Sequence, residues 1–187
     1  RSRKILLFSE LRPAPKGTWA GGYSAIMEGL GVGLHKLGHE VKMVAISYQK
    51  QPHDLPFSVI PFYSPEMTAV QLRDIIEGWY PAALLVGMDL PYQADIHAQL
   101  SAVVRYVALF PVEGEPVLGR WADGAANFDA CLTLSEFGRR ALKKAGVRSQ
   151  LIPIAATLGI GRPEPDQIAE MKVNAGLADK FIILKNA

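Results

Sequence analysis

The sequence predicts an α/β protein whose core is a doubly wound parallel sheet. Short β-rich runs alternate with longer segments of helical periodicity, which is the pattern of repeated strand-helix-strand units. The first run is continuously apolar, as expected of a strand that is buried on both faces. The chain has 187 residues, of which 49% are hydrophobic. We therefore expect one substantial core, and a disordered chain is excluded.

Seven strands are predicted, at residues 4–9, 40–46, 57–62, 82–86, 106–110, 130–133 and 150–154. Helices are predicted at residues 21–37, 65–79, 95–103 and 136–145. The first helix has apolar residues at helical spacing up to Leu37 and ends at Gly38, a residue type that favours helix ends. Within this helix, Gly29, Gly31 and Gly33 are expected to let it lie close to the sheet.

The overall charge is close to neutral, with 20 basic and 18 acidic side chains, so nothing favours a nucleic-acid partner. The longest nearly apolar stretches, 81–88 and 106–112, are too short to cross a bilayer. The apolar run at 5–8 is too short for the core of a signal peptide, so we expect a cytoplasmic protein. A single cysteine, Cys131, excludes an internal disulfide and any multi-cysteine metal site.

The composition changes after Pro153, which predicts a domain boundary. Residues 155–166 are rich in glycine and proline and are interpreted as a linker that follows a domain of residues 1–154. Residues 167–187 resume helical patterning and then begin another buried strand at Phe181. This last segment is interpreted as the truncated start of a second domain, so the chain is expected to be a fragment.

The junction after the first strand is the most informative segment. Gly21 and Gly22 open the predicted helix, where backbone N–H groups can approach an anionic group at the positive end of the helix dipole. Lys16 adds a positive charge in the same loop. The alternative is that the two glycines only permit a tight turn. The nicotinamide fingerprint, the phosphate loop and the nucleophile elbow are all missing here.

Two further groups of residues are candidates for ligand contact. His97 follows Asp89 in the segment after the fourth strand, at the sheet edge where ligands bind, although an exposed helix histidine is the alternative. A basic cluster on the last predicted helix of the first domain is a candidate face for anionic lipid or a phosphorylated acceptor, and a solvated face is the alternative. This cluster consists of Arg139, Arg140, Lys143, Lys144 and Arg148.

Four segments, taken in order, resemble the N-terminal half of a retaining glycosyltransferase of the GT-B architecture. They are 4–8, 21–23 with the helix leading to 37–41, 128–139, and 151–154 followed by Arg162-Pro163. The resemblance is to the group 1, or family 4, glycosyltransferases, which are related to glycogen and sucrose synthases. It implies a Rossmann-like N-terminal domain followed by a second Rossmann domain that binds the nucleotide sugar.

The resemblance also implies an activity and its site residues. The expected reaction transfers a sugar, of hexosyltransferase type, from a nucleotide-sugar donor to a sugar or glycolipid acceptor, with retention and without a cofactor or obligatory metal. Peripheral membrane contact is compatible with such an acceptor, and the fragment alone is expected to be inactive. Gly21, Gly22 and Lys16 would contact the donor diphosphate. The candidate acceptor-binding residues are Tyr23, Asp89, Tyr92, His97, Glu136 and Arg139.

One position departs from the family pattern. Many relatives carry a histidine just beyond the fifth strand, where this chain has Phe110-Pro-Val-Glu-Gly-Glu-Pro116. Glu113 is the polar residue nearest that place, and it is the candidate catalytic residue, expected to orient acceptor or donor hydroxyls. A non-catalytic α/β module that binds a ligand at the same edge is the competing prediction.

Overall fold

The computed structural model describes residues 1–11, 22–153 and 165–177. The chain divides into two compact units, Arg1–Ala155 and Ala156–Ala187. In the second unit the described residues form one helix, α6 (Pro165–Asn174), near the helix predicted from residue 167. The strand predicted from Phe181 lies outside the described residues.

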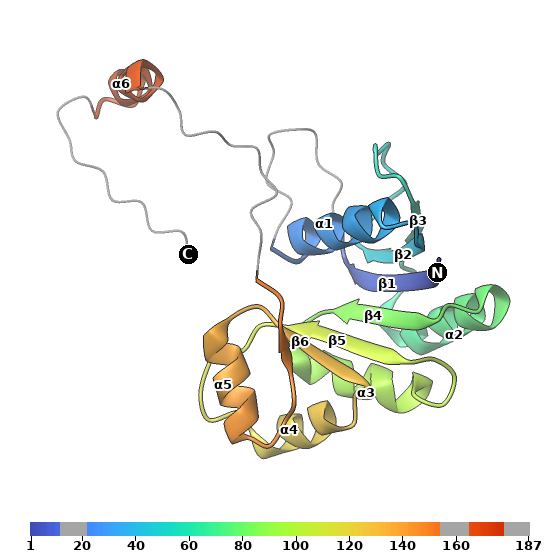
Figure 1. Cartoon of the computed structure of the whole chain (residues 1–187). Coiled ribbons are helices and arrows are strands. Elements are labelled where there is room, and N and C mark those ends of the chain that lie inside the picture. The colour runs from blue at the N-terminus through green and yellow to red at the C-terminus, as the bar shows by residue number, and fades with distance from the viewer. Residues whose placement is uncertain (12–21, 154–164, 178–187) are drawn as a thin grey trace. The chain divides into compact units, whose positions relative to one another are not determined.

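The first unit is built on a parallel sheet of seven strands among the described residues (Figure 1), which confirms the predicted fold class. The strands are β1 (Lys4–Glu10), β2 (Glu40–Ile46), β3 (Ser58–Pro61), β4 (Ala83–Gly87), β5 (Tyr106–Phe110), β6 (Ala130–Thr133) and β7 (Gln150–Leu151). Their order in the sheet is β3-β2-β1-β4-β5-β6-β7, and each neighbouring pair is parallel. The order reverses between β1 and β4, so the chain leaves these two strands in opposite directions.

Helices cover both faces of the sheet. They are α1 (Gly22–Lys36), the short 3₁₀ helix η1 (Pro65–Met67), α2 (Thr68–Trp79), α3 (Leu90–Leu100), α4 (Gly119–Ala126) and α5 (Glu136–Lys144). Figure 1 shows α1 on one face and α2 to α5 on the other. The core has two parts accordingly, one that includes Met27 of α1 and one that includes Leu72, Ile96 and Leu142 of the other layer.

Gly31 sets the close packing of α1 on the sheet. A Cβ atom at Gly31 would lie 2.6 Å from the ring of Phe57 and 3.2 Å from a methyl group of Leu7. A Cβ at Gly33 would meet nothing within 4 Å. The predicted close approach is therefore confirmed at Gly31, whereas Gly33 faces open space.

Two helices differ from the sequence prediction. The helix α3 begins at Leu90 and not at Asp95, since Pro91 stands in the first turn, where its missing N–H costs nothing. The helix α4 was not predicted because its sequence, GRWADGAA, contains two glycines and few apolar side chains. It is held by the burial of Ala122 and Ala125 against the core.

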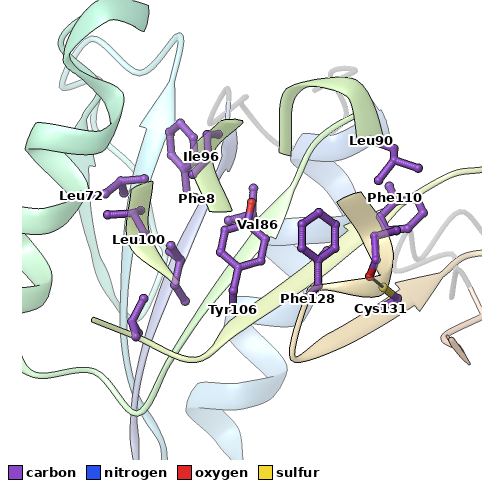
Figure 2. Close-up of a cluster of buried hydrophobic side chains, with 14 of the residues drawn as sticks. Phe8, Leu72, Val86, Leu90, Ile96, Leu100, Tyr106, Phe110, Phe128 and Cys131 are labelled. Carbon is purple, nitrogen blue, oxygen red and sulfur yellow. Dashed lines mark hydrogen bonds between the residues drawn. The ribbon is translucent and has the colours of Figure 1, made fainter. Parts of the chain in front are cut away.

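The larger part of the core contains an aromatic cluster (Figure 2). Tyr106 is fully buried and lies 5.2 Å, centroid to centroid, from Phe128. Cys131 is buried in the same layer, and its thiol lies 3.3 Å from the carbonyl oxygen of Ala125. Burial raises the pKa of Cys131 to about 11. In the part of the chain that the structure describes, no helix is long and apolar enough to cross a membrane.

Candidate functional site

The carboxyl ends of β1 and β4 are joined at the point where the strand order reverses. The hydroxyl of Ser9, a fully buried residue of β1, donates a hydrogen bond to the carbonyl oxygen of Gly87 in β4. Open parallel sheets bind ligands in the crevice outside such a reversal point. The candidate site is therefore sought among the residues that follow these strands.

Tyr23 and Asp89 meet at this edge. Tyr23 lies in the first turn of α1, Asp89 immediately precedes α3, and the Tyr23 hydroxyl donates a hydrogen bond of 2.7 Å to a carboxylate oxygen of Asp89. The pKa of Tyr23 is raised, first by burial, then by this hydrogen bond and by the negative charges of Asp89 and Glu113. Glu113 lines the same cavity as Asp89. Three residues predicted separately thus come together.

A cavity of about 330 Å³ opens beside Asp89. It is lined by Asp89, Leu90, Pro91, residues 111–117 and Trp121. Three of these residues are acidic, Asp89, Glu113 and Glu115, and no described lining residue is a lysine or an arginine. We call it the acidic cavity. Glu115 accepts a hydrogen bond from Lys144 of α5.

Gln93 holds two walls of the acidic cavity in place. This residue of α3 is fully buried, and its amide nitrogen donates to the carbonyl oxygens of Met88 (2.6 Å) and Leu109 (3.0 Å). Met88 precedes Asp89, and Leu109 lies in β5 just before the loop that carries Glu113. Sequence reasoning missed Gln93. Its burial could have been inferred from its spacing, because Gln93 lies on the same helix face as the apolar residues Ile96 and Leu100.

The acidic cavity is suited to binding hydroxyl groups. Carboxylate oxygens accept several hydrogen bonds each, and a phenol both donates and accepts. Aromatic side chains such as Trp121 bury the apolar faces of ligands. A negatively charged group would be repelled by the carboxylates of Asp89 and Glu113, whereas the charge of Glu115 is balanced by Lys144. Among residues 1–11, 22–153 and 165–177, no group of three His, Cys, Asp or Glu side chains is placed to hold a metal ion.

Three predicted acceptor residues do not line the acidic cavity. Tyr92 lies in the first turn of α3 and is 62% exposed, one residue beyond Pro91. Glu136 and Arg139 pair with each other on α5, with 2.9 Å between the arginine Nε and the carboxylate. Arg139 instead lines a separate groove along α5.

The predicted position of His97 at the ligand edge is wrong. Because α3 begins at Leu90, His97 lies two turns along the helix, where its ring packs edge-on against Tyr106 and Phe128 at centroid distances of 5.2 and 5.0 Å. Tyr106 is the first residue of β5, so this contact lies toward the opposite, amino edge of the sheet. Burial lowers the pKa of His97, and the charge of Asp129 opposes this shift.

The predicted phosphate contacts are described only in part. Lys16 and Gly21 lie outside the described residues. Gly22 is the first residue of α1, a helix of 15 residues, and a Cβ atom there would meet nothing within 4 Å.

Comparison with known proteins shows where this fold occurs. No sequence model of a protein family matches the chain, and no curated protein sequence matches it. Sucrose-phosphate synthase from Thermosynechococcus elongatus superposes with a TM-score of 0.67 and 15% identity, over 91% of this chain and 52% of that one. A glycosyltransferase from Rickettsia africae gives a TM-score of 0.64 and 13% identity, over 94% of this chain and 50% of that one.

At such low identity the likeness establishes the fold alone. The doubly wound α/β unit described above has the fold found within both structures. The chain spans about half the length of each of them.

Proposed function

We propose that this chain is the acceptor-side, Rossmann-like domain of a GT-B glycosyltransferase that uses a nucleotide-sugar donor. The observation that carries the proposal is the meeting of Tyr23, Asp89 and Glu113 beside the acidic cavity at the reversal point of the sheet. The likeness to a sucrose-phosphate synthase and a glycosyltransferase supports it. In the reaction, the bond between the sugar and the donor phosphate breaks and the acceptor hydroxyl oxygen takes the sugar. The nucleoside diphosphate leaves, and the hydroxyl proton of the acceptor is taken up by a phosphate oxygen of this leaving group.

The acidic cavity would receive the acceptor. Asp89 accepts a hydrogen bond from Tyr23 and has further lone pairs for acceptor hydroxyls. Glu113 would orient hydroxyls of acceptor or donor, and it stands after β5, where many members of the resembled family carry a histidine. A carboxylate that accepts a hydrogen bond from the attacking hydroxyl makes its oxygen more nucleophilic. Tyr92, which follows the lining residue Pro91 and is exposed, would extend the acceptor contacts.

The donor would lie at the start of α1. Backbone N–H groups at Gly21 and Gly22, aided by Lys16, would stabilise the charge that builds on the departing diphosphate. In this proposal residues 155–166 link the first domain to a second, nucleotide-sugar-binding domain that begins at residue 167. Retention of configuration, as in the related enzymes, is part of the same proposal.

Acceptor binding tests the proposal on the chain itself. Neutral mono- and disaccharides are titrated into the 187-residue chain and binding is followed by ligand-observed NMR. Asp89→Asn and Tyr23→Phe should weaken binding about tenfold each, because a ligand hydrogen bond to a charged or paired group is lost. Asp95→Asn on the exposed face of α3 is the matched control and should bind normally. Binding that is unchanged in both site variants would contradict the assignment.

Transfer is tested with a panel of nucleotide sugars and the acceptors that bind, with products identified by mass spectrometry. We expect no turnover by the 187-residue chain alone and turnover by the chain joined to a donor-binding domain from its own reading frame. Sugar binding without any turnover in the joined protein would favour the non-catalytic ligand-binding module.

A further inference from the structure

A second, oppositely charged region follows the outer face of α5. Between Glu136 and Ser149 the sequence holds five basic residues and one acidic residue, although the net charge of the whole chain is only +2. The helix buries Gly138, Ala141 and Leu142 against the sheet, so its basic side chains lie on the solvent side.

These side chains border a concave surface. A cavity of about 420 Å³ lies along α5 and the turn that follows it. It is lined by Arg139, Arg140, Lys143, Gly146, Val147, Arg148 and Ser149. Gly146 adopts a left-handed backbone conformation, with φ of 79°, which ends the helix and turns the chain toward β7. We call this surface the basic groove.

The positive charge in the basic groove is largely unbalanced. Arg139 pairs with Glu136, but within the described part of the chain Arg140, Lys143 and Arg148 have no acidic partner within ion-pair distance. Lys144 pairs with Glu115 and does not line the groove. Basic side chains on a flat helix face are usually only solvated. Three unpaired cations around one concavity attract an anion more strongly, because their fields add there.

Ser149 provides an independent observation. Its hydroxyl oxygen is buried and has no hydrogen-bond partner in the described structure, and the residue lines the groove. Buried polar atoms are nearly always hydrogen-bonded in folded proteins, so the Ser149 hydroxyl, like that of Thr133, has an unused capacity for a hydrogen bond. A hydroxyl can donate to an anion oxygen, and arginine binds phosphate in a bidentate manner.

We propose that the basic groove binds a phosphate group, through Arg140, Lys143, Arg148 and the Ser149 hydroxyl. The groove ends at residues 146–149, which precede β7 at the amino edge of the sheet, whereas Asp89 and Glu113 follow the carboxyl ends of β4 and β5. The phosphate site is thus separate from the acidic cavity and does not depend on the function proposed for it. Its ligand is a soluble phosphate compound or the headgroup of an anionic lipid.

Two probes test the proposal and distinguish the sources. Inorganic pyrophosphate is titrated into the 187-residue chain while the backbone amide signals of residues 139–149 are followed by NMR. In a second arm, the chain is sedimented with vesicles of 30% phosphatidylglycerol in phosphatidylcholine and with pure phosphatidylcholine. Pyrophosphate binding supports a soluble ligand. Binding to the anionic vesicles alone supports a lipid headgroup, and binding to neither overturns the proposal.

Charge variants locate the binding. The triple variant R140Q/K143Q/R148Q should weaken binding of the active probe at least about tenfold, and higher salt should weaken binding to the wild-type chain. The control variant K36Q/R105Q removes exposed basic charge elsewhere and should bind nearly as the wild type does. Unchanged binding in the triple variant, or an equal loss in the control, would overturn the assignment to this groove.

Ser149→Ala separates ligand binding from stability. Among the described residues the Ser149 hydroxyl has no partner to lose, so the thermal unfolding midpoint should stay the same or rise. Affinity for the active probe should fall several-fold, because a hydrogen bond to a charged group is lost. Wild-type affinity in this variant would contradict the role of the hydroxyl.

Discussion

The acidic cavity and the basic groove are charged in opposite ways and are also built in different ways. The carboxylates of the acidic cavity come from two segments, one after β4 and one after β5, which the sheet brings together. The cations of the basic groove come from α5 and the turn that follows it. The acidic cavity therefore depends on the packing of two segments from different strands, whereas the basic groove is formed by one continuous segment. Substitutions at the ends of β4 and β5 should damage the cavity and spare the groove.

The strongest test of this difference is Asp89→Ala. It removes the carboxylate that accepts the Tyr23 hydroxyl and lines the acidic cavity. Sugar binding should fall about 100-fold, or ~3 kcal/mol, since charge-assisted hydrogen bonds are lost and the phenol loses its acceptor. Calorimetry with the best-binding sugar measures this effect. Pyrophosphate binding should not change, and a parallel loss of both would mean that the two regions are coupled.

Gln93→Leu should give the next largest effect, on stability. The carbonyl oxygen of Met88 loses the amide nitrogen that donates to it at 2.6 Å, so we expect a loss of about 2 kcal/mol in the free energy of unfolding. The control is Gln99→Leu on the same helix, an exposed position that should change stability by less than about 0.5 kcal/mol. Urea unfolding measures both.

Gln93→Leu should affect the acidic cavity and leave the basic groove unchanged. Because Gln93 links the ends of β4 and β5, sugar binding by the folded Gln93→Leu variant should also weaken. Binding of pyrophosphate at α5 should be retained. A variant that loses neither stability nor sugar binding would show that Gln93 does not hold the cavity in place.

Two glycine substitutions test the packing of α1, the helix that contains Tyr23, against the sheet. Gly31→Ala would place a Cβ 2.6 Å from the Phe57 ring, and we expect it to destabilise the chain by about 1 to 2 kcal/mol. Gly33→Ala, in open space in the same helix, should stabilise it by up to about 1 kcal/mol. Thermal unfolding distinguishes the two, and equal effects would contradict the packing described for α1.

The smallest expected effect is a pH dependence of stability that arises from His97, a residue outside both the acidic cavity and the basic groove. Burial lowers the pKa of His97 in the folded chain, so the unfolded chain binds its proton more readily. The stability that this residue contributes is complete above about pH 6.5, the usual pKa of histidine, and is lost as the pH falls through the lower, folded value. Urea unfolding at pH 7 and pH 5 should show a smaller difference for His97→Phe. His35→Gln, at the exposed end of α1, should keep the wild-type difference.

The strands could be predicted from the sequence because each of the longer ones contains a run of mostly apolar residues. The predicted bounds of β2, β5 and β6 agree with the structure. The strand β7 is shorter than predicted, although the backbone N–H of Ile152 still donates to Thr133 beyond its assigned end. Helix α4 could not be predicted, since it forms from a sequence of poor helical propensity through packing.

Three residues of the candidate site could be singled out from the sequence, but their arrangement could not. Asp89 and Glu113 follow the ends of predicted strands, and Tyr23 lies at the start of the helix after the first strand. Their proximity depends on the strand order, which places β1, β4 and β5 side by side. The position of His97 was predicted wrongly because α3 begins five residues earlier than expected. His97 therefore lies more than one helical turn farther from the carboxyl edge of the sheet than predicted.

The buried thiol of Cys131 can be used to measure how often the folded chain opens. It is the single cysteine of the chain, and with a pKa of about 11 its thiol is rarely the reactive thiolate near neutral pH. A thiol reagent should therefore modify the folded chain mainly through molecules that have opened transiently. When reclosing is fast, the labelling rate measures the population of open molecules, and the stability of each variant above can be followed at low concentration without denaturant.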